Sequence, residues 1–166
     1  MKKVFFIFLL SFLIISGCSK DDQNVEKRVD AKTKIASVNY PLHYFAQRIG
    51  GNHIEAIFPL PTDVDPAYWQ PDAAAIARFQ QTDIILLNGA GYAKWIDKVS
   101  LPASRMINTS DGFRNHYIEL EEGMTHSHGP DGAHVHRGYA FTTWLNLKLA
   151  VEQAGVVKER LIQVHP

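Results

Sequence analysis

The stretch Ile84-Ile85-Leu86-Leu87-Asn88-Gly89-Ala90-Gly91 decides the fold expected for this 166-residue chain. Its first four residues are all apolar, which is typical of a central strand in a parallel sheet covered on both faces. The Asn-Gly-Ala-Gly sequence predicts a tight turn rather than half of a dinucleotide-binding motif, because the third glycine of that motif is missing. We therefore expect a buried strand, a turn, and then a short helix containing Trp95 and Ile96.

Strand and helix patterns alternate on both sides of this stretch. Strands are expected at 34–39, 54–58 and 105–108, with a short additional one at 117–120. A helix from Pro41 should bury one stripe made of Leu42, Phe45, Ala46 and Ile49, and Asp72 should cap a second helix over 73–80. This alternation predicts an α/β fold, with a parallel four-stranded sheet and flanking helices.

The loops expected at the carboxyl ends of the strands are 59–71 and 88–91, and ligands bind at this edge in such sheets. Loop 59–71 contains Asp63 and Asp65, which we interpret as turn or cap residues rather than a catalytic pair. The aromatic residues of both loops either pack beneath the binding face or line a ligand cleft, and they are Tyr68, Trp69, Tyr92 and Trp95.

A long helix is expected over 144–166, capped by Thr142 or Thr143. Its apolar residues fall on one stripe. They are Leu147, Val151, Ala154, Val157, Leu161 and Val164.

The segment 125–137 contains four of the eight histidines as two His-x-His pairs around a Gly-Pro-Asp-Gly turn. Residues two apart on an extended segment point to the same side, and the turn can fold one pair back toward the other. Neutral imidazoles suit a divalent ion such as Zn²⁺. The predicted ligands are His126, His128, His134 and His136; the alternative is a solvated tract that binds metal loosely. The lone histidines His43 and His53 are expected to be surface or hydrogen-bonded residues. His116 is expected to begin a strand, and a role as a spare ligand is the alternative for it.

The N-terminus has the pattern of an export signal. Two lysines precede a twelve-residue apolar run over 4–15, too short for a typical membrane-spanning helix, and Cys18 is the only cysteine. The run Ile15-Ser16-Gly17-Cys18 resembles the bacterial lipobox, which implies a signal peptide over 1–17 and a lipid on Cys18. The polar segment 18–33 should be a flexible tether to the membrane.

The charge balance gives no reason to expect a nucleic-acid partner, because 17 basic residues equal 17 acidic ones. The sequence contains no arrangement of nucleophile and base or phosphate loop that favours an enzyme. We therefore expect a binding protein.

Taken in order, Tyr40-Pro41-Leu42, the proline-rich loop 59–71, the turn 88–91, the histidine tract and Trp144-Leu145 resemble the zinc and manganese ABC-transporter solute-binding lipoproteins. That family has two α/β lobes joined by a long helix. The resemblance implies that 34–143 is the first lobe and 144–166 the linking helix. It also implies an extracytoplasmic protein, lipid-anchored at the periplasm or cell surface, that delivers Zn²⁺, Mn²⁺ or another divalent metal ion to a membrane ABC permease.

The family's histidine ligands are replaced in this chain. The run Asp65-Pro66-Ala67-Tyr68 has alanine where the resemblance implies a first histidine, and Phe141-Thr142-Thr143-Trp144 has threonine at the second. Either the histidine tract has taken over metal capture, or the chain is a truncated copy without the second lobe, and both can hold together. A metal-buffering lipoprotein that never meets a permease is the alternative function.

Overall fold

The computed structural model describes residues 32–120, 125–127, 133–135 and 138–164, and for 125–127 and 133–135 the description is of the backbone. The segment Lys32–Pro166 forms one compact unit. At its centre is a sheet with the order β2-β1-β3-β4, made of β1 (Thr33–Ser37), β2 (Ile54–Ile57), β3 (Ile84–Leu87) and β4 (Met106–Asn108). The pairings of β1 with β2, β1 with β3 and β3 with β4 are parallel, so the predicted sheet is confirmed.

β3 is an inner strand of the sheet, because β1 and β4 pair with its two edges. Its residues Ile84, Ile85 and Leu86 are each at most 1% exposed. Consecutive side chains of a strand point to opposite faces, so burial of all three requires cover on both faces. The central, doubly covered strand predicted from the apolar run is therefore confirmed.

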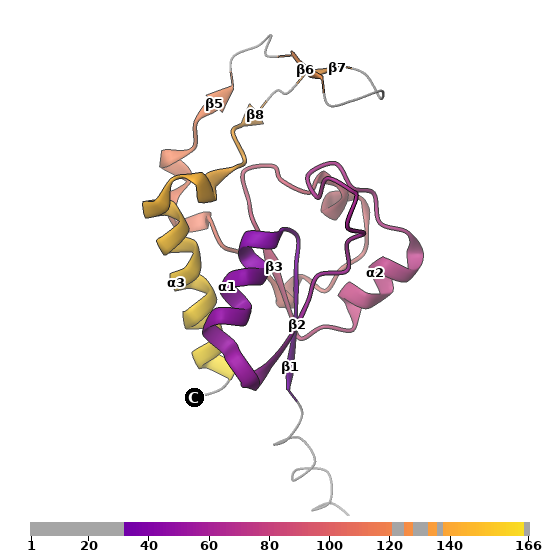
Figure 1. Ribbon diagram of the computed structural model, residues 1–166, viewed down its shortest axis with the longest axis vertical. Coiled ribbons are helices and arrows are strands. Elements are labelled where there is room, and N and C mark those ends of the chain that lie inside the picture. Colours follow the sequence, from indigo (N-terminus) through magenta and orange to yellow (C-terminus); the bar gives the residue numbers. More distant parts are fainter. Residues whose placement is uncertain (1–31, 121–124, 128–132, 136–137, 165–166) are drawn as a thin grey trace, which may run out of the picture. The chain divides into compact units, whose positions relative to one another are not determined.

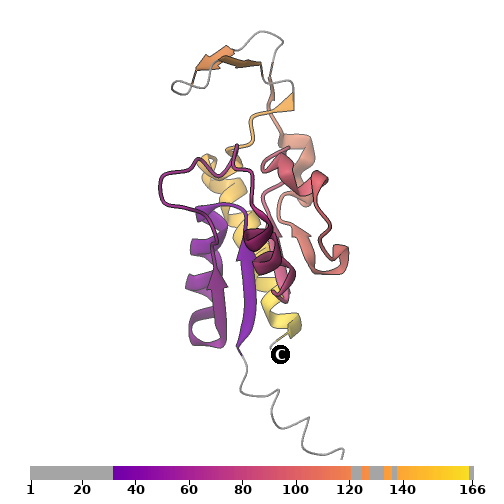
Figure 2. The same ribbon diagram turned by 90° about the vertical axis from the view of Figure 1, so that its right-hand side faces the viewer.

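Helices supply this cover. α1 (Tyr40–Gly50) packs on one face together with α3 (Leu147–Val164), and α2 (Ala73–Gln80) lies on the other (Figures 1 and 2). The Asn39 side chain caps α1 by accepting a hydrogen bond from the backbone N–H of Leu42 at 3.0 Å. Asp72 caps α2 in the same way, accepting from the N–H of Ala75 at 2.7 Å, as predicted.

The predicted stripe of α1 is correct at its start and wrong at its end. Leu42 and Ala46 are buried, and Phe45 packs against the core, but Ile49 is 39% exposed. Gly50 takes the buried position in the last turn. A side chain there would collide with Ile54 at the start of β2, so only glycine allows the helix to approach the strand this closely.

α3 begins at Leu147, three residues later than predicted. A short 3₁₀ helix, η6 (Thr143–Leu145), precedes it, and the Asn146 side chain accepts a hydrogen bond from the N–H of Lys148 at 3.1 Å. The predicted cap at Thr142 or Thr143 is therefore wrong, because the 3₁₀ turn displaces the helix start past both residues.

The predicted stripe of α3 is correct at Val157 and Leu161 and wrong at its start. Leu147 and Val151 are 78% and 72% exposed. The buried residues are Leu149, Gln153, Val157 and Leu161. The stripe was misassigned because a glutamine occupies a core position of the helix, where a pattern of apolar residues cannot reveal it.

The segment after β4 forms small elements of its own. The 3₁₀ helix η5 (Asp111–His116) is followed by β5 (Glu119–Leu120), which pairs antiparallel with β8 (Gly138–Tyr139). The predicted strand at 117–120 is thus shorter and lies outside the main sheet, and His116 ends a helix rather than beginning a strand. A second antiparallel pair consists of β6 (Thr125–Ser127) and β7 (Ala133–Val135).

The predicted signal peptide 1–17 and the predicted lipid site Cys18 lie outside the described residues, and so does most of the predicted tether 18–33. Thr33, the last residue of that tether, is already the first residue of β1. Among the helices that the structure describes, none is long and apolar enough to span a membrane.

Candidate ligand cleft and metal site

The turn after β3 carries the chain across the carboxyl end of the sheet. Residues 89–91 all have positive φ, at 75°, 52° and 74°, and the N–H of Tyr92 donates to the carbonyl of Gly89 at 3.0 Å. A Cβ atom on Gly89 would collide with the side chains of Asn108 and Ser110. Glycine is required here for both its backbone conformation and this close approach, and the predicted tight turn is confirmed.

A buried cluster of amide side chains joins this turn to α3 and to the ends of the neighbouring strands. Asn39, Asn88 and Gln153 are each at most 1% exposed. Asn39 Nδ2 donates to Asn88 Oδ1 at 3.0 Å, and Gln153 Nε2 donates to Thr109 Oγ1 at 2.9 Å and to Asn88 Oδ1 at 3.3 Å. Asn88 Nδ2 donates to the carbonyl of Phe141 at 2.9 Å. We call Asn39, Asn88 and Gln153 the amide cluster; it ties α3 and the backbone at residue 141 to the ends of β1 and β3.

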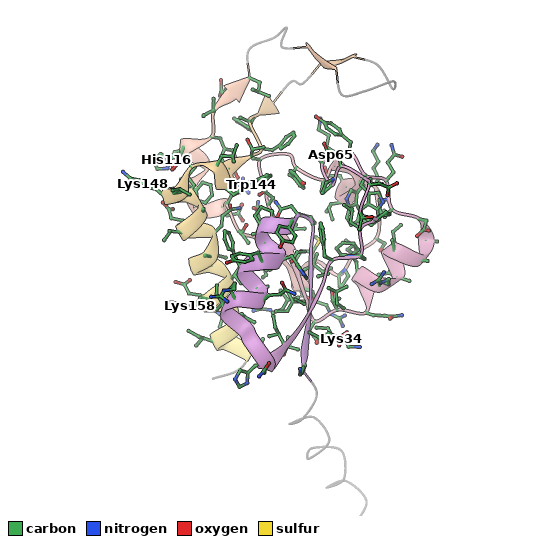
Figure 3. All side chains as sticks on the ribbon, viewed as in Figure 1. Lys34, Asp65, His116, Trp144, Lys148 and Lys158 are labelled. Carbon is green, nitrogen blue, oxygen red and sulfur yellow. The ribbon has the colours of Figure 1, made fainter. Side chains whose placement is uncertain are left out.

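Two neighbouring cavities lie at this edge of the sheet. The first, the aromatic cavity, has a volume of about 480 Å³ and lies between loop 59–71, the start of α1 and residues 139–144. Both Asp65 and Trp144 lie at the end of the domain where α3 begins (Figure 3). The cavity is lined by six aromatic residues: Tyr40, Tyr68, Tyr92, Tyr139, Phe141 and Trp144.

Asp65 is the one carboxylate among the described residues that line the aromatic cavity. Its Oδ1 accepts a hydrogen bond from the N–H of Ala67 at 2.9 Å, which confirms the interpretation of Asp65 as a turn residue. Burial, together with the nearby charge of Asp65, raises the pKa of Tyr68 and of Tyr92. Both phenols therefore remain neutral at physiological pH and offer hydroxyl groups rather than anionic ligands.

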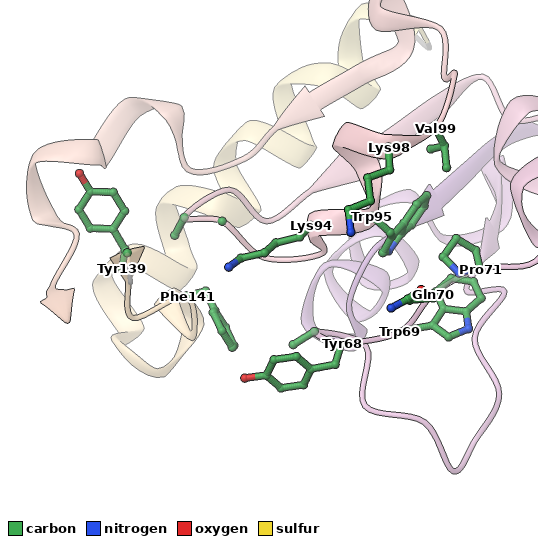
Figure 4. A pocket seen from close by; sticks show the side chains of 14 residues that line it. Tyr68, Trp69, Gln70, Pro71, Lys94, Trp95, Lys98, Val99, Tyr139 and Phe141 are labelled. Atoms are coloured by element: carbon green, nitrogen blue, oxygen red, sulfur yellow. The ribbon is translucent and has the colours of Figure 1, made fainter. Parts of the chain in front are cut away.

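The second cavity, the lysine cavity, has a volume of about 470 Å³ and lies between loop 67–71, the 3₁₀ helix η3 (Lys94–Lys98) and residues 138–141 (Figure 4). The rings of Trp69 and Trp95 line it with their centroids 5.7 Å apart. Trp95 also packs against Phe79 in the core, with centroids 5.0 Å apart. Both interpretations of the aromatic residues therefore hold, because the same rings cover the core and line a cleft.

The two cavities share Ala67, Tyr68, Tyr139 and Phe141. The rings of Tyr68 and Phe141 meet edge to face with centroids 6.4 Å apart, and together they form the wall between the cavities. Sequence reasoning assigned neither Lys94 nor Lys98 to a site. The available signal was their spacing of four residues around Trp95, just after the glycine turn.

The predicted metal ligands belong to the segment that contains β6 and β7. In the backbone register of this pair, His126 is the partner of His134. The side chains of these two residues lie outside the described part of the chain, as do His128, His136 and the predicted lipid site Cys18. The four-histidine site therefore stays a prediction.

Within the described ranges, no group of three or more histidine, cysteine, aspartate or glutamate side chains could hold a metal ion. His43 is half-buried and stacks on Phe58 with ring centroids 5.6 Å apart. Its Nδ1 atom is buried and has no hydrogen-bond partner among the described residues, and burial lowers the pKa of the imidazole. His43 is therefore a partly exposed residue whose ring also contributes to packing.

Comparison with known families decides how this cleft should be understood. Residues 35–166 match the family described as zinc-uptake complex component A, periplasmic. The chain belongs to this family. The family consists of periplasmic solute-binding proteins, which are not enzymes, so the prediction of a binding protein is confirmed.

Relatives in this zinc-uptake family are longer than this chain. It is 24% identical to the zinc-binding lipoprotein AdcA of Streptococcus pneumoniae over 172 residues, covering 100% of this chain and 33% of that protein. It is 23% identical to the high-affinity zinc uptake system protein ZnuA of Bacillus subtilis over 129 residues, covering 74% of this chain and 39% of that one. The chain thus spans well under half the length of the curated relatives it matches.

Solved structures agree on the fold. The periplasmic zinc-binding protein TroA of Treponema pallidum superimposes with a TM-score of 0.64 at 19% identity, covering 81% of this chain and 45% of that one. The metal-dependent lipoprotein YcdH of Bacillus subtilis gives a TM-score of 0.61 at 19% identity, covering 80% and 44%. The expectation that this chain forms one lobe of a two-lobed fold is confirmed.

The positions of the two replaced ligands of the zinc-uptake family come together in the structure. Ala67 and Thr142, where the resemblance implies histidines, both line the aromatic cavity. Its described lining contains one carboxylate and no imidazole. Such a donor set does not fit zinc, which favours several nitrogen or sulfur ligands.

Proposed function

We propose that this chain captures zinc outside the cytoplasm through His126, His128, His134 and His136, for uptake through a membrane ABC permease. Four neutral imidazoles satisfy the tetrahedral preference of Zn²⁺. The permease is the proposed partner, and Cys18 the proposed site of the lipid that holds the protein at the membrane.

The observation that carries this proposal is the antiparallel register of β6 and β7, with His126 as the backbone partner of His134. Directly opposed residues of an antiparallel pair are close cross-strand neighbours. Each belongs to a His-x-His pair, so the register sets one histidine of each pair beside the other, and we propose that His128 and His136 complete the site. The zinc-binding names of the relatives and the poor donor set at Ala67 and Thr142 support the same proposal.

Isothermal titration calorimetry with zinc on the segment Lys32–Pro166 tests the site. We expect tight binding that is lost when the four histidines are replaced together by alanine. The matched control is the double variant His53→Ala, His116→Ala, which removes two histidines outside the tract and should bind zinc normally. Tight binding that survives the fourfold replacement would overturn the proposal.

Proton competition gives a second measurement. Ligation requires neutral imidazole, so zinc affinity should fall as the pH drops below the ordinary histidine pKa of about 6.5. Affinity that is constant between pH 7.5 and pH 5.5 would contradict histidine ligation.

Growth of a deletion strain tests the transport role. A strain lacking this protein should grow poorly under zinc starvation and recover when zinc is added. A Cys18→Ser variant should leave the membrane fraction, because it lacks the thiol that carries the lipid. Normal growth of the deletion strain would favour the metal-buffering alternative.

A further inference from the structure

The lysine cavity combines aromatic walls with two cationic side chains. Tyr68, Trp69 and Phe141 supply apolar ring surface, while Lys94 and Lys98 extend from η3 at its border (Figure 4). Its volume of about 470 Å³ falls in the range typical of small-molecule sites. The cavity therefore has room for an organic molecule rather than for a bare ion alone.

The charges around the lysine cavity favour an anion. Its described lining contains no aspartate or glutamate, and within the described ranges neither Lys94 nor Lys98 forms an ion pair with a carboxylate. Asp97 belongs to the same helix but does not line the cavity, and Asp65 lines the neighbouring aromatic cavity. A negative group on a ligand would thus be attracted to the lysine side and repelled from the Asp65 side.

We propose that the lysine cavity binds a flat organic anion, such as an aromatic carboxylate. The planar body lies among the rings of Tyr68, Trp69 and Phe141, and the carboxylate contacts the ammonium groups of Lys94 and Lys98. This geometry uses ring stacking for the body and charge-assisted hydrogen bonds for the anionic end. The site is separate from the histidine tract and does not depend on the proposed capture of zinc.

Two probes of the same shape and opposite charge test this site: 1-naphthoate and (1-naphthyl)methylammonium. Calorimetric titration of the segment Lys32–Pro166 should show that naphthoate binds at least about tenfold more tightly. Equal affinity for both probes, or no binding of naphthoate, would overturn the proposal, because ring surface alone does not distinguish charge.

Variants locate the binding. The double variant Lys94→Ala, Lys98→Ala should lose about tenfold in naphthoate affinity and little in affinity for the cationic probe. The control is Lys158→Ala, an exposed lysine toward the far end of α3 (Figure 3), which should change nothing. Since both lysines are exposed, their removal should leave the fold intact. Unchanged naphthoate affinity in the double variant would overturn the proposal.

Two further measurements separate this site from zinc capture. Trp69 and Trp95 line the lysine cavity, so naphthoate should change the tryptophan fluorescence, and Tyr68→Ala should weaken that response. Replacing the four tract histidines by alanine should abolish zinc binding and leave naphthoate binding unchanged. A loss of naphthoate binding in that variant would contradict a separate site.

Discussion

The amide cluster and the histidine tract differ in how the fold holds them. Asn39, Asn88 and Gln153 are buried and hydrogen-bonded across β1, β3 and α3. β6 and β7 of the tract hydrogen-bond with one another in a sheet of their own. The stability of the domain is thus expected to depend on the amide cluster and the proposed metal chemistry on the tract, so a mutation in one should leave the other unchanged.

Removing Gln153 should produce the largest loss of stability. Gln153→Ala leaves a cavity and buried polar groups without partners, so the free energy of unfolding should fall by about 2 to 4 kcal/mol. Urea unfolding followed by fluorescence measures this. Gln163→Ala, on an exposed part of the same helix, is the control and should cost under about 0.5 kcal/mol. Similar losses in both variants would show that burial of the amide is unimportant.

The cap of α2 should contribute less than the amide cluster. Asp72→Ala removes the acceptor for the N–H of Ala75 and should cost about 1 kcal/mol in the same unfolding assay. The control is Asp63→Ala, which also removes a carboxylate but lies in the exposed loop before the helix. It should leave the free energy of unfolding nearly unchanged. A cost for Asp72→Ala no larger than this control would contradict the capping role.

His43 should give the framework a pH dependence of smaller size. Burial lowers its pKa in the folded state, so the unfolded chain binds more protons as the pH falls. The contribution to stability is complete above the unfolded pKa of about 6.5 and is lost progressively below it. In His43→Phe, the thermal unfolding midpoint should change less between pH 7.5 and pH 5 than in the unmodified protein. His116→Phe should retain the original pH dependence of the midpoint. An unchanged slope in His43→Phe would assign the pH dependence to other groups.

The smallest effect on stability is expected in the tract itself. Replacing His126, His128, His134 and His136 together by alanine should change the metal-free unfolding free energy by less than about 0.5 kcal/mol, while zinc binding is lost. Urea unfolding with and without zinc measures both quantities. A metal-free loss above about 1 kcal/mol would show that the tract contributes to the stability of the domain as the amide cluster does.

Much of the framework was predictable because its signals are local. The apolar run Ile84–Leu87 marked the buried strand, and Asp72 marked the start of α2. The errors arose where tertiary contacts override periodicity. Gln153 is buried because the residues directly after β3 and β4, Asn88 and Thr109, satisfy its amide. Leu147 is exposed because the helix turns another face to the sheet. Neither contact can be inferred from spacing along the chain.

The cleft was predictable only in its location. Loop 59–71 and the turn 88–91 both line it, as strand ends in a parallel sheet require. Its chemistry comes from segments far apart in the sequence: Tyr68 from one loop, Lys94 from η3 and Phe141 from the segment before α3. The density of histidines stood out in the composition, but the convergence of their side chains remains a prediction.

The pairing of β5 with β8 has a practical consequence. Leu120 and Gly138 are partners in this short ladder, so the two residues that flank 121–137 lie next to each other. A change in the length of 121–137 should therefore leave the main sheet in place, because the residues that flank this segment are already held together. This base is a natural place to exchange the segment with that of another species, or to graft a reporter peptide.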